Sequence, residues 1–155
     1  MDKVKILKAV IAELERELRR QMAANASASA GATHGEARAE TKWDTCGLEQ
    51  SYLARGHAQQ FAALAVQVEE LRAFTPPSFV EKPIGVGALV EAEMGGVPMV
   101  FFLLKCGGGV EVDVEGREVS VITPESPVGA ALMEQKQGGT YSFRAGSVGK
   151  VLGVK

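Results

Sequence analysis

The feature that most constrains the fold is a change of hydrophobic period at a proline-rich segment, T-P-P-S-F-V-E-K-P (75–83). Before this segment, apolar residues recur at steps of three and four, which is typical of a helix that pairs with another helix. After it, short apolar runs separated by glycines predict β-strands. We therefore expect a helical part (1–75), a short stiff linker (76–83) and a sheet domain (84–155).

The helical part predicts an antiparallel coiled-coil hairpin. The first helix is expected from Lys3 to about Ala24, and the second from about Gly35 to Phe74, because Pro76 and Pro77 follow. Residues 24–32, A-N-A-S-A-S-A-G-A, predict either a frayed helix end or a flexible hinge. The predicted seam consists of Leu7, Ile11, Leu14 and Leu18, with Val4, Val10 and Met22 beside them, and of Phe61, Leu64, Val68 and Leu71 in the second helix.

The hairpin tip, expected within about 25–44, carries the acids Glu36, Glu40 and Asp44 at intervals of four. Like charges at this spacing weaken a helix, so the row favours a cationic counterpart outside it, either a metal ion or a basic partner. Alternatively, Thr33 and Glu36 form a capping box that starts the second helix, and the other two acids interact with the helix dipole or with solvent. Both interpretations stay open on the residues alone.

The sheet domain predicts four to six strands and one short helix, which is an α+β arrangement. Strands are expected at Val86–Met94, Val97–Lys105, Val110–Val114, Glu118–Thr123, Thr140–Arg144 and Val148–Val154. Gly95-Gly96 and Glu115-Gly116 have the composition of hairpin turns. The short helix is expected to begin at Ser126 or Pro127 and to run through Met133, with the serine as cap and the proline in the first turn.

Composition excludes several classes of protein. The 155 residues carry a net charge of -2 with a pI near 5.8, which argues against direct binding of bare nucleic acid. No apolar run has the length of a membrane span and the first residues lack the pattern of a signal peptide, so we expect a cytoplasmic protein with no membrane partner. Cys46 and Cys106 are expected to be free thiols of unassigned role. The oligomeric state is left open, since a heptad seam also pairs between chains.

The segment V-S-V-I-T-P-E-S-P-V-G-A-A-L-M-E-Q-K-Q-G-G (119–139) resembles the C-terminal domain of the Gre family (GreA/GreB) of bacterial transcript cleavage factors. Residues 134–139 depart from the Gly-Lys and Gly-Asp pairs usual in that family. The hairpin layout of the first half is similar to the Gre coiled coil, and Gly35-Glu36-Ala37-Arg38-Ala39-Glu40-Thr41-Lys42-Trp43 can be laid over the family's tip without gaps.

This resemblance implies an FKBP-like C-terminal domain, with an antiparallel β-sheet and one short helix. It also implies a transcription elongation factor that binds bacterial RNA polymerase. The domain would dock at the rim of the secondary channel, with Ser126 and Pro127 as docking residues, and the coiled coil would reach the active centre. There Glu36 and Glu40 would assist cleavage of backtracked RNA by helping to hold a Mg²⁺ ion shared with the polymerase. The chain would regulate transcription without being an enzyme, would hold no cofactor of its own, and would contact RNA and DNA only through the polymerase.

Three other functions stay open for this chain. The family's second tip acid falls on Ala39, with Glu40 one position later, so the chain could instead be a channel-binding regulator or competitor without cleavage activity. A prolyl isomerase would need an aromatic pocket, for which the domain offers Phe79, Phe101, Phe102, Tyr141 and Phe143. An interaction module unconnected with polymerase is the fourth hypothesis.

Overall fold

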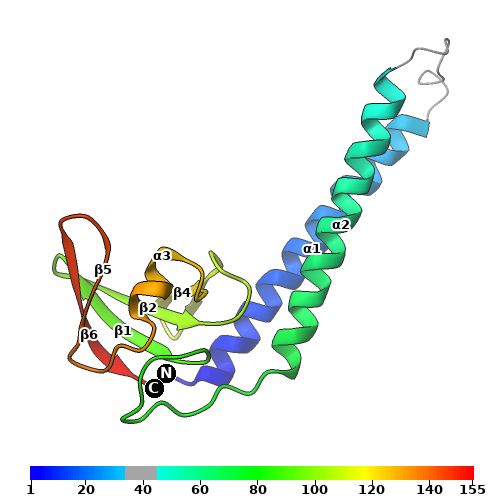
Figure 1. Ribbon diagram of the computed structural model, residues 1–155. Helices are drawn as coiled ribbons and strands as arrows, with labels where there is room; N and C mark the ends of the chain where they lie inside the picture. Colours follow the sequence, from blue (N-terminus) through cyan, green and yellow to red (C-terminus); the bar gives the residue numbers. More distant parts are fainter. Residues whose placement is uncertain (34–44) are drawn as a thin grey trace. The chain divides into compact units, whose positions relative to one another are not determined.

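The structure is a computed structural model that describes the backbone of residues 1–33 and 45–155, and the side chains of residues 1–27, 53 and 55–155. Two long helices precede a sheet that carries one short helix (Figure 1). The helices are α1 (Lys3–Thr33), α2 (Thr45–Ala73) and α3 (Pro127–Leu132). The strands are β1 (Leu89–Met94), β2 (Val97–Leu103), β3 (Glu111–Val114), β4 (Arg117–Ile122), β5 (Thr140–Arg144) and β6 (Ser147–Val154). The predicted α+β class is confirmed.

The first helix is longer than predicted. It continues through residues 24–32 and ends at Thr33, so the hinge interpretation of that segment is wrong. The alternating alanines explain the difference, because alanine is the strongest helix former and offsets the intervening serines. Thr33 is the last residue of α1, and the prediction that it caps the second helix is also wrong. The second helix begins at Thr45 among the described residues, and residues 35–44 of its predicted span lie outside them.

The chain forms two compact units, residues 14–69 and residues 1–13 together with 70–155. In the first unit, Leu14 and Val68 of the predicted seam are buried, whereas Phe61 and Leu64 are half-buried. Met22, predicted beside the seam, is 54% exposed. The seam prediction therefore holds at one end of this helical pair and weakens along it, as expected when each helix has only one neighbour to pack against.

The second unit contains a six-stranded sheet with the order β3-β4-β2-β1-β6-β5. The sheet is antiparallel as predicted at four of its five strand pairings, and the prediction is wrong at the fifth, because β2 and β4 pair in parallel, with Phe102 opposite Val121. The strands β3 and β4 form an antiparallel hairpin, and β4 is the strand of this hairpin that lies beside β2. In this position β4 runs in the same direction as β2. Both predicted hairpin turns are present, and Gly95, Gly96, Glu115 and Gly116 all have positive φ, as type I′ turns require.

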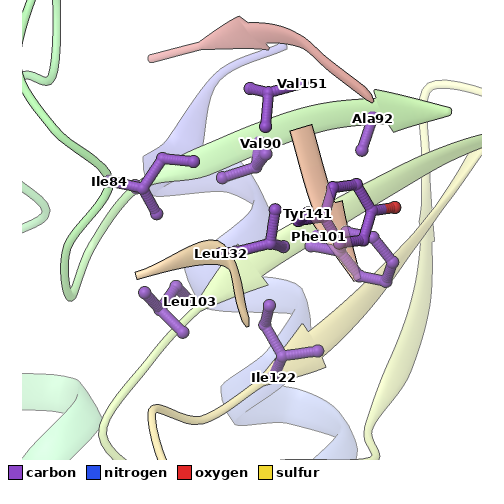
Figure 2. Close-up of a cluster of buried hydrophobic side chains, with 10 residues drawn as sticks. Ile84, Val90, Ala92, Phe101, Leu103, Ile122, Leu132, Tyr141 and Val151 are labelled. Carbon is purple, nitrogen blue, oxygen red and sulfur yellow. The ribbon is translucent and has the colours of Figure 1, made fainter. Parts of the chain in front are cut away.

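One face of the sheet packs against α3. Leu132 of α3 contacts a buried cluster that includes Val90, Phe101, Ile122 and Val151 (Figure 2). Successive residues of a strand point to opposite faces, so Phe102 points away from this cluster, yet it is also fully buried. The sheet therefore has two buried faces.

The start of α1 belongs to this second unit. Ile6 and Val10 are fully buried, and Lys5 makes an ion pair of 3.1 Å with Glu115 in the turn between β3 and β4. Figure 2 shows α1 in pale blue behind the strands, on the side away from α3. The first turns of α1 thus cover the second face of the sheet, which explains why Ile6 is buried although it lies outside the predicted seam.

Candidate functional site

The acids proposed to act at the hairpin tip, Glu36, Glu40 and Asp44, lie outside the described residues. The structure describes the two helix ends that flank them. Thr33 ends α1 and Thr45 begins α2, so a segment of eleven residues (34–44) joins the two helices. With 31 and 29 residues, the helices are each about 45 Å long, from the rise of about 1.5 Å per residue.

Ser126 and Pro127, the predicted docking residues, start α3 as the sequence indicates. The Ser126 hydroxyl accepts a hydrogen bond of 3.1 Å from the Gly129 backbone N–H and donates one of 2.7 Å to the Thr123 carbonyl. Pro127 occupies the first turn, where its missing N–H leaves no helical bond unmade. The helix start is confirmed, whereas the docking role of both residues stays a prediction.

Gly129 makes this helix start possible. A Cβ atom added at Gly129 would lie 1.9 Å from the Thr123 carbonyl oxygen and 2.9 Å from the Ser126 hydroxyl oxygen. Only glycine permits this close approach of α3 to the end of β4. The sequence carries one signal for this role, which was missed: Gly129 lies two residues after Pro127 of the S-P pair. Ser126 and Pro127 are therefore held on a fixed backbone.

Lys3 ties the start of α1 to the segment that precedes the sheet. Its ammonium group donates a hydrogen bond of 3.1 Å to the Gly87 carbonyl and another to the Pro77 carbonyl. It also lies 5.3 Å from the centroid of the Phe79 ring, within the range of a cation–π contact. Burial lowers the pKa of Lys3. Lys3 thus holds the start of α1 against residues 77–87.

Cys106 lies beside a pocket of about 300 Å³ lined by Leu71, Phe74 and Val86, among others. Its thiol is partly buried, and burial raises the pKa of this thiol, with a further increase from the charge of Glu70 and a hydrogen bond to that carboxylate. A thiol held in its neutral form is a poor nucleophile. This agrees with the predicted free thiol at Cys106; the side chain of Cys46 lies outside the described part of α2.

The aromatic residues considered for an isomerase pocket lie on both faces of the sheet and in the segment that precedes it. Phe101 and Tyr141 are buried in the cluster beneath α3 (Figure 2), and Phe102 is buried on the opposite face of the sheet. Phe143 stacks on Tyr141 with a centroid distance of 6.4 Å. Phe79 alone of the five lines a described pocket, one of about 490 Å³. These side chains serve mainly as core.

No group of three or more His, Cys, Asp or Glu side chains is arranged to hold a metal ion within the described parts of the chain. None of the helices described there is long and apolar enough to cross a bilayer. The predicted Mg²⁺ ligands Glu36 and Glu40 lie outside these residues. They stay a prediction.

Comparison with known proteins returns solved structures of GreA factor homologues. The chain is similar to GreA factor homolog 1 (Gfh1) of Thermus thermophilus, with 19% identity over 96% of both chains and a TM-score of 0.39. It is similar to a second structure of the transcription factor Gfh1, with 21% identity over 95% of this chain and 94% of that one and a TM-score of 0.40. The corresponding values for Gfh1 of Thermus aquaticus are 18%, 95%, 94% and 0.38. No protein-family model and no curated protein matches the sequence.

Proposed function

We propose that this chain is a Gre-like transcription elongation factor that binds bacterial RNA polymerase. Its helical hairpin inserts into the secondary channel, and its sheet domain docks at the channel rim. The chain carries no complete active site in this proposal. It acts by presenting acidic side chains to the hydrolytic centre of the polymerase, so that backtracked RNA is cleaved there.

The observation that carries the proposal is the pair of long helices joined by an acidic segment. Each helix is about 45 Å long, and the eleven joining residues include Glu36, Glu40 and Asp44. A long, narrow hairpin suits insertion into a channel, where a globular domain would not fit. The lengthened α1 adds support, because Thr33 belongs to α1 and the capping-box explanation for Glu36 loses its cap residue.

Glu36 and Glu40 supply carboxylate oxygens to a Mg²⁺ ion shared with the polymerase in this proposal. Mg²⁺ is a hard cation that accepts one or two protein carboxylates and keeps several waters, so two acids are a sufficient contribution. Such an ion lowers the pKa of bound water and stabilises the oxygens of a phosphodiester under attack. The remaining ligands belong to the polymerase.

A regulator that occupies the channel without stimulating cleavage is the second candidate. It is favoured by one observation: the position of the second acid in the family's tip is Ala39 here, and Glu40 follows one residue later. One residue corresponds to about 100° around a helix. If Glu40 points away from the polymerase centre, Glu36 alone does not complete the pair of acids, and the hairpin blocks the channel instead.

Cleavage of RNA in a purified backtracked elongation complex tests the proposal. The polymerase of the source organism is incubated with the wild-type chain, with Glu36→Ala or with Glu40→Ala, at constant Mg²⁺. Faster cleavage that either variant abolishes is the expected result. Glu111→Ala, an exposed acid of β3 away from Ser126 and Pro127, is the matched control and should leave the rate unchanged. Binding without faster cleavage would establish the blocking regulator instead.

Docking is tested separately by polymerase binding. Pro127→Ala keeps the Ser126 cap and the fold of α3, because the first helical position needs no N–H partner. Weaker binding of this variant, with unchanged thermal unfolding, is expected if Pro127 contacts the polymerase. Unchanged binding would limit Pro127 to starting the helix. No binding by the wild-type chain would favour an interaction module of another pathway.

A further inference from the structure

The second described pocket lies between the linker and the loop that follows α3. It has a volume of about 490 Å³, within the range of small-ligand sites. Residues 79–82 form one wall, Lys136 and Gln137 form the other, and Val154 of β6 completes the lining. Segments separated by more than fifty residues in sequence thus form one concave surface.

Backbone hydrogen bonds hold the two walls together. The Ile84 N–H donates to the Gln135 carbonyl at 2.8 Å, and the Glu134 N–H donates to the Ile84 carbonyl at 3.0 Å. Within the walls, the Lys82 N–H donates to the Phe79 carbonyl at 3.1 Å, and the Gly139 N–H donates to the Lys136 carbonyl at 2.9 Å. The pocket is therefore built on fixed backbone, which reduces the ordering cost of binding.

The charged side chains of the pocket are unpaired. Lys82 and Lys136 belong to different walls, Glu81 precedes Lys82 in the chain, and none of the three takes part in an ion pair among the residues that the structure describes. The formal charge of the lining is +1, from two lysines and one glutamate. Gln137 adds an amide that donates or accepts a hydrogen bond.

The rest of the lining is apolar. Phe79 and Val154 are half-buried, and Val80 is 68% exposed. An apolar surface next to two unpaired cations is complementary to a molecule with an apolar body and one negative charge. A fully hydrated inorganic ion would leave the apolar wall unused.

We propose that this pocket binds a small organic monoanion, a carboxylate with an aryl or branched aliphatic body. The carboxylate lies between Lys82 and Lys136, and the apolar body rests on Phe79, Val80 and Val154. This binding site goes beyond the proposed action on polymerase and does not depend on it.

A titration of the full chain with benzoate, followed by backbone amide shifts in NMR spectra, tests the proposal. Saturable shifts are expected at residues 79–82 and 136–137, with a dissociation constant on the order of 1–10 mM for so small a probe. Benzamide keeps the shape and lacks the charge, whereas acetate keeps the charge and lacks the ring. Both should bind more weakly than benzoate.

The double variant Lys82→Gln/Lys136→Gln should weaken benzoate binding about tenfold, because both charge-assisted contacts are lost. Lys150→Gln, an exposed lysine of β6 outside the pocket lining, is the matched control and should bind as the wild type does. Amide spectra of the unliganded variants verify that each is folded. Equal binding of benzamide and benzoate, undiminished binding by the double variant, or shifts spread evenly over all lysines would each overturn the proposal. Tighter binding of phenyl phosphate than of benzoate would overturn the assignment to a monoanion.

Discussion

The sheet unit and the helical unit of residues 14–69 are stabilised in different ways. Among the described side chains, only Leu14 and Val68 of the helical unit are buried apolar residues, whereas the sheet unit buries two full faces. Each helix of a two-helix seam leaves most of its circumference in water. Packing volume should therefore decide stability in the sheet unit, and helix propensity and surface pairs such as Glu15–Arg19, at 3.9 Å, should matter more in the helical unit.

The largest expected effect is that of Phe102→Ala. Phe102 is fully buried, and loss of a buried phenyl ring leaves a cavity that costs about 3–5 kcal/mol. Leu64→Ala, at a half-buried position of the helical unit, should cost about 1 kcal/mol. Hydrogen exchange measured separately on β1–β2 and on α2 gives the local stability of each unit. Similar losses from the two substitutions would contradict the contrast between the units.

Gly129→Ala should destabilise the sheet unit by about 3 kcal/mol. The new methyl group would lie 1.9 Å from a backbone oxygen, so α3 must move away from the end of β4. Urea denaturation followed by far-UV circular dichroism measures the change in the free energy of unfolding. Ala130→Gly, on the exposed side of α3, is the control and should cost no more than about 1 kcal/mol. A neutral Gly129→Ala would show that the approach of α3 to Thr123 is not required.

Local patterns predicted the elements of the sheet unit well. Alternation of apolar residues and the glycine turns located the strands to within a few residues, because both signals arise from neighbours in sequence. The parallel pairing of β2 with β4 could not be predicted in this way, since periodicity does not identify which strand lies beside which. The burial of Ile6 was missed for a similar reason: the α1 pattern was interpreted with one partner helix, and the sheet is a second partner.

The candidate sites also differ in whether sequence neighbours or distant segments form them. The role of Ser126 as a cap followed from local chemistry and is confirmed by its hydrogen bond to Gly129. The pocket between Lys82 and Lys136 depends on the pairing of Ile84 with residues 134–135, which no local signal reveals. The acids Glu36 and Glu40 stay predictions based on resemblance, because they lie outside the described residues.

Tyr141→Phe should stabilise the sheet unit by about 1 kcal/mol. The hydroxyl of Tyr141 is buried without a hydrogen-bond partner among the described residues, and an unsatisfied buried polar group costs about 1–3 kcal/mol. The ring itself is retained by the substitution, including its contact with Gly149. Chemical denaturation measures the gain. A loss of stability would show that the hydroxyl has a partner, such as a bound water, that phenylalanine cannot replace.

Gly56→Ala tests the other side of the comparison. Gly56 lies within α2, and a Cβ atom added there would meet nothing within 4 Å. Alanine should therefore stabilise the helical unit by about 0.5–1 kcal/mol through helix propensity alone. Hydrogen exchange of α2 amides should slow while that of β1–β2 stays unchanged. No change in α2 would mean that propensity does not limit the stability of this unit.

The smallest effect is expected from the ionisation of Cys106. Burial, followed by the charge and hydrogen bond of Glu70, raises the pKa of this thiol above its ordinary value of 9.0. As pH rises past that value, the unfolded thiol loses its proton while the folded thiol keeps it, so the unfolded state binds fewer protons and the free energy of unfolding falls. The decline should begin before Tyr141 contributes, since the ordinary pKa of tyrosine is 10.0 and burial raises the pKa of Tyr141 further.

Denaturation under reducing conditions between about pH 8 and pH 10 measures how the free energy of unfolding changes with pH, and Cys106→Ala should make this slope smaller. An equal slope in that variant would assign the decline to Tyr141 or to Lys5, whose pKa is raised by its hydrogen bond and ion pair with Glu115.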